Sequence, residues 1–390
     1  MNRRAIVLSG GGARGAYEAG VISVVLERAA KRPGPWVDFV CGTSVGAITG
    51  AHLAANIDQP SEASRELLRF WSELSIEDVL AFGADQLRAL PRLVFGGNKS
   101  AGLFDGRTLT RLVDRHLRWA GIGEHVASGR LKALTITATH VPSGYATMFV
   151  QRGPDVPRPG NGRRRTLVRD ATIGAAHVLA SAAIPVFFPP VRVDGDLYCD
   201  GGLTSNTPLG PAIRLGANKV LAISLSATRR EPGVAANRYP SASFLLGKLL
   251  NTFLLDRVTN DLDELDRINQ FMKDGAAVSG PDFETRMAAV AVERGKRPYH
   301  TVEAVVVRPS VDLGEIAADQ LRRMRRRLGR VSVARGLVQF LDATDGEGSD
   351  LASYLLFDRA YAADLIALGR VDALVSVDAI DAFILDERAP

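Results

Sequence analysis

The sequence has few cysteines and little net charge, and each scarcity excludes a class of protein. Only 2 cysteines occur among 390 residues, too few for a disulfide scaffold. Lys and Arg number 48 against 43 Asp and Glu, so the formal net charge of +5 dictates neither an acidic nor a strongly basic partner. Hydrophobic residues make up 46% of the chain, which excludes disorder as the whole description and supplies material for a core.

Long apolar runs are also missing. Ala5–Leu8, the apolar stretch nearest the N-terminus, is too short for the hydrophobic region of a secretory signal. The longest uncharged stretch, Ala171–Val191, contains three prolines and a histidine, so we interpret it as buried core rather than a membrane span. We therefore expect a cytoplasmic protein, with peripheral membrane contact and export by a route independent of the Sec signal left open.

Motifs that hold metals are absent from the sequence. It contains no H-E-x-x-H, no C-x-x-C and no D-x-D-x-D-G. We therefore predict no metal site and no cofactor.

The order of the expected elements indicates a layered fold. Apolar stretches at residues 5–9 and 37–41 are typical of buried strands, and each is followed by a glycine turn and a helical pattern. This alternation predicts a three-layer α/β/α fold with a mainly parallel central sheet and helical additions. We expect a catalytic domain over residues 1–311 and a helical extension over residues 312–390.

Further strands are expected at residues 131–139, 145–150 and 219–225, near residues 191 and 197, and at residues 302–307. Helices are expected over most of residues 61–117 and at residues 208–215 and 243–272, with a polar, mobile stretch at residues 227–241. The aromatic residues of the first helical region line an apolar groove or belong to the core, and the pattern does not decide between these interpretations. They are Phe70, Trp71, Phe82, Phe95 and Phe104.

The turn Gly42-Thr43-Ser44-Val45-Gly46 lies directly between an apolar strand and a helix. In this context G-x-S-x-G is typical of a nucleophile elbow, in which a strained serine is exposed above the start of a helix. Glycines flank the serine because a Cβ there would strike the neighbouring strand or helix. The alternative is a plain turn with a capping serine.

The turn that follows the first strand is richest in glycine and comprises Gly10, Gly11, Gly12, Ala13, Arg14 and Gly15. The pattern G-x-G-x-x-G also marks dinucleotide sites, but those need an acidic residue at the end of the second strand, and Asp38 lies at the start of that strand. Successive backbone N–H groups can instead form an oxyanion hole. We take Gly11 and Gly12 as the best donors and expect Arg14 to fix the loop.

Asp200 follows a short strand and precedes Gly201 and Gly202. Its carboxylate would emerge at the sheet edge that also presents Ser44. An Asp-Gly turn is common in any protein, so this feature alone is weak.

Together the three turns resemble the patatin-like phospholipase family, which carries G-x-G-x-x-G, G-x-S-x-G and D-G-[AG] in this order. The block Ala180–Pro185, Phe188–Val191, Asp200–Leu203 with Asn206 and Pro208 is similar to the family's aspartate signature, and Ser353–Phe357 is similar to the tail of bacterial members. The resemblance implies a serine acyl hydrolase with a Ser44–Asp200 dyad that acts on lipid esters.

A conventional triad would add a histidine. His52 lies eight residues after Ser44 on the same helix, about 12 Å along its axis, and cannot reach back. His300 alone follows Asp200 in the chain, but it precedes a strand instead of leaving one. A dyad requires burial to raise the basicity of Asp200.

Other classes remain open at this stage. They are a nucleotide-binding oxidoreductase that uses Gly10–Gly15 and a non-catalytic lipid-binding module. The arginine-rich stretch Arg322–Arg327 is either a solvated helix face or a contact for anionic lipid, and no nucleic-acid partner is indicated. Cys41 and Cys199 are either buried small side chains or provide a redox-sensitive thiol near the dyad. The oligomeric state, the head group and the acyl-chain preference are not readable from the sequence.

Overall fold

The computed structural model describes residues 3–79, 104, 106–160, 165–227, 248, 252, 257–294, 298–327 and 349–385 of the chain. Its strands are β1 (Arg4–Leu8), β2 (Phe39–Thr43), β3 (Ala133–His140), β4 (Tyr145–Arg152), β5 (Thr166–Asp170), β6 (Val191–Val193), β7 (Asp196–Asp200), β8 (Lys219–Ile223) and β9 (Glu303–Val307). Its helices up to β8 are η1 (Gly12–Arg14), α1 (Gly15–Ala29), α2 (Val45–Ala55), α3 (Pro60–Glu73), α4 (Ile76–Val79), α6 (Gly106–His116), α7 (Trp119–Ala127), α8 (Ala175–Ser181), η2 (Gly201–Leu203) and α9 (Leu209–Leu215). The later helices are α11 (Arg257–Ser279), α12 (Phe283–Glu293), α13 (Leu313–Arg327), α15 (Ser349–Leu355), α16 (Arg359–Val375) and α17 (Val377–Leu385).

One mixed, mostly parallel sheet organises the molecule, and its main path runs β5-β4-β3-β2-β1-β8-β9. The strands from β3 to β9 along this path are parallel to one another, whereas β4 is antiparallel to β3 and parallel to β5. The hairpin of β6 and β7 joins the sheet through β7, which pairs antiparallel with the end of β3. The predicted mainly parallel sheet is therefore confirmed.

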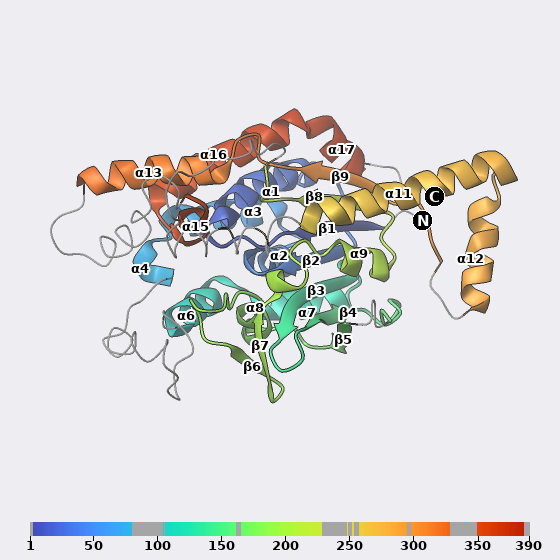
Figure 1. Cartoon of the computed structure of the whole chain (residues 1–390), viewed down its shortest axis with the longest axis horizontal. Coiled ribbons are helices and arrows are strands. Elements are labelled where there is room, and N and C mark those ends of the chain that lie inside the picture. The colour runs from blue at the N-terminus through green and yellow to red at the C-terminus, as the bar shows by residue number, and fades with distance from the viewer. Residues whose placement is uncertain are drawn as a thin grey trace, which may run out of the picture.

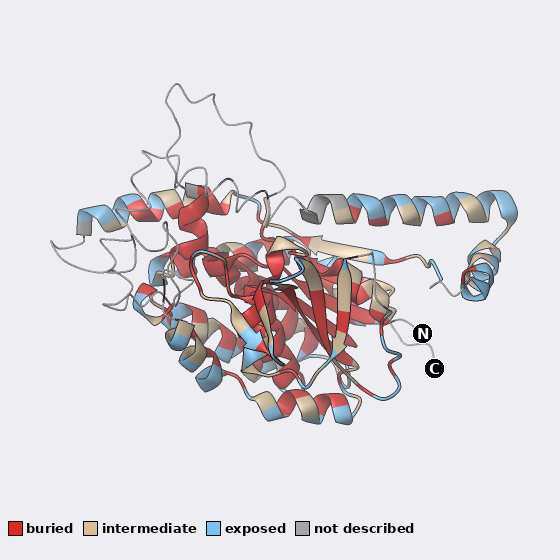
Figure 2. Cartoon of the chain, turned by 60° about the horizontal axis from the view of Figure 1, so that its bottom comes forward, coloured by how far each residue is buried: buried red, intermediate tan, exposed pale blue. Residues whose placement is uncertain are grey.

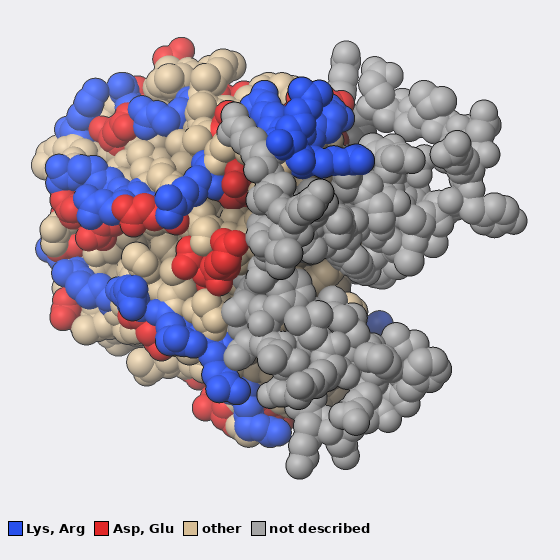
Figure 3. Space-filling view, turned by 90° about the vertical axis from the view of Figure 1, so that its left-hand side faces the viewer, with Lys and Arg blue, Asp and Glu red and all other residues tan. Residues whose placement is uncertain are grey.

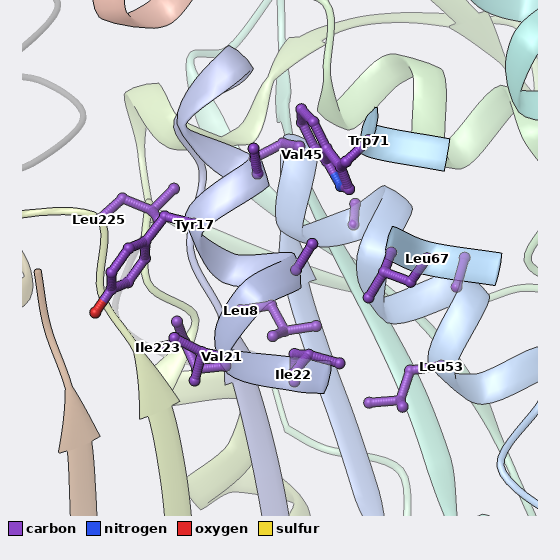
Figure 4. Close-up of a cluster of buried hydrophobic side chains, with 14 of the residues drawn as sticks. Leu8, Tyr17, Val21, Ile22, Val45, Leu53, Leu67, Trp71, Ile223 and Leu225 are labelled. Atoms are coloured by element: carbon purple, nitrogen blue, oxygen red, sulfur yellow. The ribbon is translucent and has the colours of Figure 1, made fainter. Parts of the chain in front are cut away.

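Helices cover both faces of this sheet, because its central strands are apolar on both sides. In β1, Ile6 and Leu8 pack against the face covered by α1, α2, α3 and α16. Ala5 and Val7 point to the other face, where they pack with α9 and α11. Figure 4 shows the first of these layers, with Leu8 and Ile223 of the sheet beneath Val21 and Ile22 of α1. The result is the predicted three-layer α/β/α arrangement (Figure 1).

The last helices belong to the same core as the sheet. Buried residues of α13, α15, α16 and α17 lie in one hydrophobic cluster with those of α1 and α2. The backbones of α1 and α16 approach closely at two glycines: a Cβ at Gly20 would lie 2.3 Å from the Ile366 carbonyl oxygen, and one at Gly369 would lie 2.2 Å from that of Tyr17. The division at residue 311 stays a prediction, and the helices after it stabilise the sheet directly.

The helices α11 and α12 project from one side of the molecule, away from the sheet (Figure 2). Their contact is made where Phe283 lies against Gly275 and stacks edge to face on Phe271, with ring centres 6.0 Å apart. The predicted helix over residues 243–272 corresponds to α11 from residue 257 onward. The described residues do not include most of the first part of that predicted helix or nearly all of the stretch 227–241. They also do not include Phe82 and Phe95.

Among the described helices, none is long and apolar enough to cross a bilayer. The stretch Ala171–Val191 folds instead into α8 and the start of β6, and its central part, Val178–Ile184, is buried.

Candidate active site

Ser44 lies in a strained turn between β2 and α2. Its φ of 55° falls in the region that side chains rarely adopt, and only 3% of the residue is exposed. A Cβ on Gly42 would lie 2.2 Å from the Gly46 carbonyl oxygen, and one on Gly46 would lie 2.4 Å from that of Leu8. Both glycines are therefore required by close backbone approach, as the sequence predicts for an elbow.

Two strands that run toward each other bring Ser44 and Asp200 together. The first part of β3 pairs with β2 as far as Thr137 opposite Thr43. From the next residue β3 pairs with β7, with Ala138 opposite Asp200. The two C-terminal ends therefore meet head-on along one edge of β3. The serine Oγ donates a 2.6 Å hydrogen bond to Asp200 Oδ2.

Asp200 is buried, with 1% of the residue exposed, and the Gly202 N–H donates to its Oδ1 at 2.7 Å. Burial raises the pKa of Asp200 from 3.8 to about 7, and the hydrogen bonds from Ser44 and Gly202 oppose this rise. Such a carboxyl changes protonation near neutral pH and can both accept and return a proton there.

The glycine loop after β1 lies beside the serine. A Cβ on Gly10 would lie 2.9 Å from the Cβ of Ser44. Gly12 has φ +57°, and a Cβ there would lie 2.3 Å from the Tyr354 carbonyl oxygen. Within the described part of the chain, neither the Gly11 nor the Gly12 N–H donates a hydrogen bond to a protein acceptor. Two donors are thus available near the nucleophile.

Arg14 anchors this loop to the C-terminal part of the chain. Only 1% of the residue is exposed, its Nε donates to Ser353 Oγ at 2.8 Å, and its guanidinium lies 4.3 Å from the centre of the Tyr354 ring. Asp350 is 4.0 Å away. The expectation that Arg14 fixes the loop is consistent with these contacts, and its partners lie in α15.

Two residues near the site were not assigned roles from the sequence. Ser181 accepts a hydrogen bond from the Ser44 N–H at 2.8 Å and donates to the Thr137 carbonyl at 2.6 Å, so it holds the backbone of the turn. Glu18 of α1 is fully buried beside Thr49 and Ser9, and burial raises its pKa from 4.5 to about 8. Ser181 was visible only as part of a family block, and a glutamate within an apolar helix carries no pattern that predicts its burial.

No histidine contacts the pair. All six lie in the described residues, and none hydrogen-bonds Ser44 or Asp200. Their nearest polar or ring partners are Ala63 for His52, Phe70 for His116, Asp58 for His125, Ser143 for His140, Gly174 for His177 and Ala217 for His300. This arrangement favours a dyad over a triad.

An apolar cavity opens beside Ser44. Among the residues that line it are Val45, Ile48, Phe70, Trp71, Phe188 and Leu355. Phe70 and Trp71 therefore line a cavity, whereas Phe104 packs in the core against Phe187, with ring centres 6.0 Å apart. Both interpretations of the aromatic residues thus apply, and Trp71, which is also buried in the core, fulfils both.

The two cysteines are buried near the site. Burial raises the pKa of the Cys41 thiol to about 12 and, together with the charge of Asp200, that of the Cys199 thiol to about 11. Thiols of such high pKa react slowly, which favours a packing role for both. In the described residues no group of three or more His, Cys, Asp or Glu side chains could hold a metal ion.

The molecule has an α/β fold with a mixed, mostly parallel sheet, and the turn that carries Ser44 has the strand-to-helix geometry typical of a nucleophile elbow. The chain belongs to the patatin-like phospholipase family, because the family model described as patatin-like phospholipase matches residues 6–213. This family comprises carboxylic-ester hydrolases.

Several curated proteins are similar over the same region. An uncharacterized NTE family protein of Mycobacterium tuberculosis is 28% identical over 267 residues, which cover 68% of this chain and 61% of that protein. A cGAMP-activated phospholipase of Pseudomonas aeruginosa is 32% identical over 205 residues, 52% of this chain and 53% of that protein. The chain thus spans less than two thirds of the length of these relatives.

Solved structures resemble the chain more distantly. Human GIVD cytosolic phospholipase A2 in complex with methyl gamma-linolenyl fluorophosphonate aligns with 99% of this chain and 58% of its own, at 13% identity and a TM-score of 0.42. VipD from Legionella pneumophila covers 91% of this chain and 66% of its own, at 14% identity and a TM-score of 0.36.

Proposed function

We propose that the chain is a serine acyl hydrolase that cleaves lipid carboxylic esters with a Ser44–Asp200 dyad. The observation that carries the proposal is the 2.6 Å hydrogen bond from the serine hydroxyl to a buried carboxyl beside an apolar cavity. Family membership supports ester hydrolysis over the nucleotide-binding alternative. The side chain of Asp38 also accepts a hydrogen bond from the Arg4 N–H, which gives it a structural role.

In the acylation step the Ser44 oxygen attacks the ester carbonyl as its proton passes to Asp200. The carbonyl electrons move to the oxygen, which receives hydrogen bonds from the Gly11 and Gly12 N–H groups. The start of α2, directly after Ser44, adds a partial positive charge that favours the serine alkoxide. When the tetrahedral intermediate collapses, the C–O bond to the alcohol breaks and Asp200 returns the proton to the leaving oxygen.

Deacylation repeats these steps with water. Asp200 removes a proton from a water molecule, the resulting hydroxide attacks the acyl carbonyl, and Ser44 leaves with the proton from Asp200. The products are a fatty acid and the free enzyme. A carboxyl with a pKa near 7 can act as both general base and general acid, because neither of its protonation states is strongly favoured at neutral pH.

The apolar lining of the cavity supports a lipid ester as substrate. Side chains such as Ile48 and Leu355 offer an acyl chain no hydrogen-bonding groups and gain from burying its methylenes. We therefore expect long-chain esters to have lower KM than acetyl or butyryl esters with the same alcohol.

A fluorophosphonate with an alkyl chain tests the proposal directly. The expected result is one covalent adduct per chain, mapped to Ser44 by peptide mass spectrometry, together with release of fatty acid from phospholipid or lysophospholipid. Ser44→Ala should abolish both signals, and the surface variant Ser143→Ala should retain them. The absence of labelling on folded protein that still binds phospholipid would instead favour the non-catalytic lipid-binding module.

The carboxyl is tested by Asp200→Asn, with the exposed Asp155→Asn as its matched control. We expect ester hydrolysis to fall by about 10³-fold or more, because an amide cannot take the serine proton. Near-normal turnover by Asp200→Asn would contradict the dyad. Tight binding of NAD(P) by unlabelled protein would point to the nucleotide-binding alternative.

A further inference from the structure

The segment Ser205–Thr207, shortly after the turn Asp200-Gly201-Gly202 (the aspartate loop), connects all three glycine turns. Ser205 accepts a 3.0 Å hydrogen bond at its carbonyl from Thr43 Oγ1, next to the nucleophile. Thr207 Oγ1 lies 2.7 Å from Ser9 Oγ, at the end of β1. Between them, Asn206 reaches the glycine loop. This segment therefore joins the ends of β1 and β2 to the loop that carries Asp200.

Asn206 holds Gly10 by two hydrogen bonds. The Gly10 N–H donates to the backbone carbonyl of Asn206 at 3.1 Å. The side-chain Nδ2 of Asn206 donates to the Gly10 carbonyl, also at 3.1 Å. Only 1% of Asn206 is exposed. Its Oδ1 would lie 2.3 Å from a Cβ on Gly10, so the side chain packs directly against the glycine backbone.

The second of these hydrogen bonds sets the direction of a neighbouring donor. The Gly10 carbonyl and the Gly11 N–H belong to one trans peptide unit, in which C=O and N–H point in opposite directions. Because the Gly10 carbonyl is held toward Asn206, the Gly11 N–H points away from the Asn206 side chain. That N–H has no protein acceptor among the described residues. A peptide between two glycines is otherwise free to rotate, because neither residue has a Cβ to restrict it.

We propose that Asn206 is a positioning residue of the oxyanion hole, which fixes the Gly10–Gly11 peptide so that the Gly11 N–H is aimed at the reacting oxygen. The inference rests on the proposed function and deepens it. Through this contact, the segment Ser205–Thr207 becomes part of the catalytic machinery at the glycine loop. Asn206 makes no hydrogen bond to Ser44 within the described residues, so its role is exerted through the Gly10 backbone.

The test uses Asn206→Leu, which keeps the size of the side chain and removes its donor, and Asn206→Asp, which keeps its shape and replaces the donor by an acceptor. In each, kcat for a long-chain ester should fall by about 10- to 100-fold with KM within about threefold of wild type, since an oxyanion donor acts mainly in the transition state. Affinity for an alkyl trifluoromethyl ketone, whose adduct with Ser44 carries an oxyanion, should weaken by the same factor as kcat/KM.

Asn269 offers a matched control. Its side chain makes a two-point contact with Val302, donating from Nδ2 to the backbone carbonyl at 2.8 Å and accepting at Oδ1 from the N–H at 3.0 Å, between α11 and the residue before β9. Asn269→Leu should lower thermal stability and leave kcat within about twofold of wild type, because it contacts no residue of the site.

The outcomes separate this inference from the proposed function. If wild-type protein hydrolyses esters and labels at Ser44, but folded Asn206 variants keep kcat and ketone affinity, the positioning role is wrong and the dyad stands. A rise in KM with unchanged kcat, or a loss that Asn269→Leu reproduces, would equally overturn it. If wild-type protein neither hydrolyses esters nor labels, the proposed function fails first.

Discussion

At the residue scale, the site combines a strained backbone with a buried carboxyl, and a second buried carboxyl lies in α1. Ser44 has a φ of 55°, and Asp200 and Glu18 are carboxyls buried where their charged forms are disfavoured. Strain and buried ionisable groups of this kind concentrate at functional sites because the surrounding structure must be arranged to hold them. Ser181, which binds both the Ser44 N–H and the Thr137 carbonyl, is one such support.

The raised pKa of Asp200 predicts how activity depends on pH. The base must be ionised to take the serine proton, so kcat/KM for an uncharged ester should fall about tenfold per pH unit below about 7 and level off above it. The rate of fluorophosphonate labelling at Ser44 should follow the same curve. A kcat/KM that stays constant from pH 8 down to about 5 would contradict a base with a raised pKa, since a carboxyl of ordinary pKa is ionised throughout that range.

Glu18 predicts a change in stability with pH. Its pKa is raised from 4.5 in the unfolded chain to about 8 in the folded one, so the folded state binds the extra proton between these values and stability falls as pH rises through them. Glu18→Gln removes this penalty. The variant should unfold at higher urea than wild type at pH 9 and show no such gain at pH 4, whereas the exposed Glu124→Gln should match wild type at both. An equal effect of Glu18→Gln at both pH values would be inconsistent with a buried, protonated carboxyl.

At the scale of elements, the loop of the proposed oxyanion hole is held from two sides. Asn206 contacts Gly10 from the segment Ser205–Thr207, and α15 contacts Arg14 and Gly12 from the C-terminal part of the chain. The family model ends at residue 213, well before α15. A segment outside the matched region therefore contributes to the geometry of the site and, through Leu355, to the wall of the cavity.

This contact predicts that Ser353→Ala weakens both stability and turnover. The variant leaves the buried Arg14 Nε without its hydroxyl acceptor, and hydrogen bonds to charged groups contribute about 1.5 to 3 kcal/mol. We expect the free energy of unfolding, measured in urea, to fall by about that amount and kcat to fall several-fold. Ser376→Ala, at the end of α16, serves as a control. Unchanged kcat in a destabilised Ser353→Ala would limit α15 to a structural role.

The elements that could be predicted are those whose local residue pattern matches their burial or backbone packing in the fold. Apolar strands β1, β2 and β8 and the glycine turns were predictable because burial and close backbone approach leave direct traces in residue type. The edge strand β5 was not predicted, since Thr166–Asp170 is short, partly exposed and ends in charged residues. The separate helix α12 was also missed, because only one of its residues, Ala291, is buried and its pattern is weak.

The site was predictable in its residues but not in its topology. The motifs in the three turns predicted Ser44 and Asp200 as the pair. No local sequence pattern, however, indicates that β7 runs antiparallel to β3 and meets β2 head-on. The residues that hold the glycine loop were not predictable either. Asn206 binds Gly10 across 196 positions of sequence, and Ser353 binds Arg14 across 339. Such long-range hydrogen bonds depend on the whole fold and leave no spacing that a single sequence reveals.

At the scale of the whole molecule, the site and the projecting hairpin lie at opposite ends. Figure 1 places α13, α15 and α6 at one end and the α11–α12 hairpin at the other. Because α13 packs on α15, and α15 packs on the glycine loop, the arginine-rich end of α13 belongs to the end of the molecule that carries the site. Figure 3 views this end, and Lys and Arg side chains gather at its upper edge, where Figure 1 places α13.

We therefore propose that the exposed arginines of α13 contact anionic lipid and bring the cavity to a membrane surface. Arg325 and Arg326 are exposed, and each basic side chain near an anionic surface contributes about 1 kcal/mol. Replacing both by Glu should weaken sedimentation with phosphatidylserine vesicles by about tenfold or more, while hydrolysis of a monomeric soluble ester stays unchanged. The same change at Arg286 of α12 and at Arg294, which directly follows that helix, should have little effect at the opposite end of the molecule. Because salt screens such contacts, raised ionic strength should abolish the difference between the two variants. Equal vesicle binding by both at low salt would exclude α13 as the membrane-facing surface.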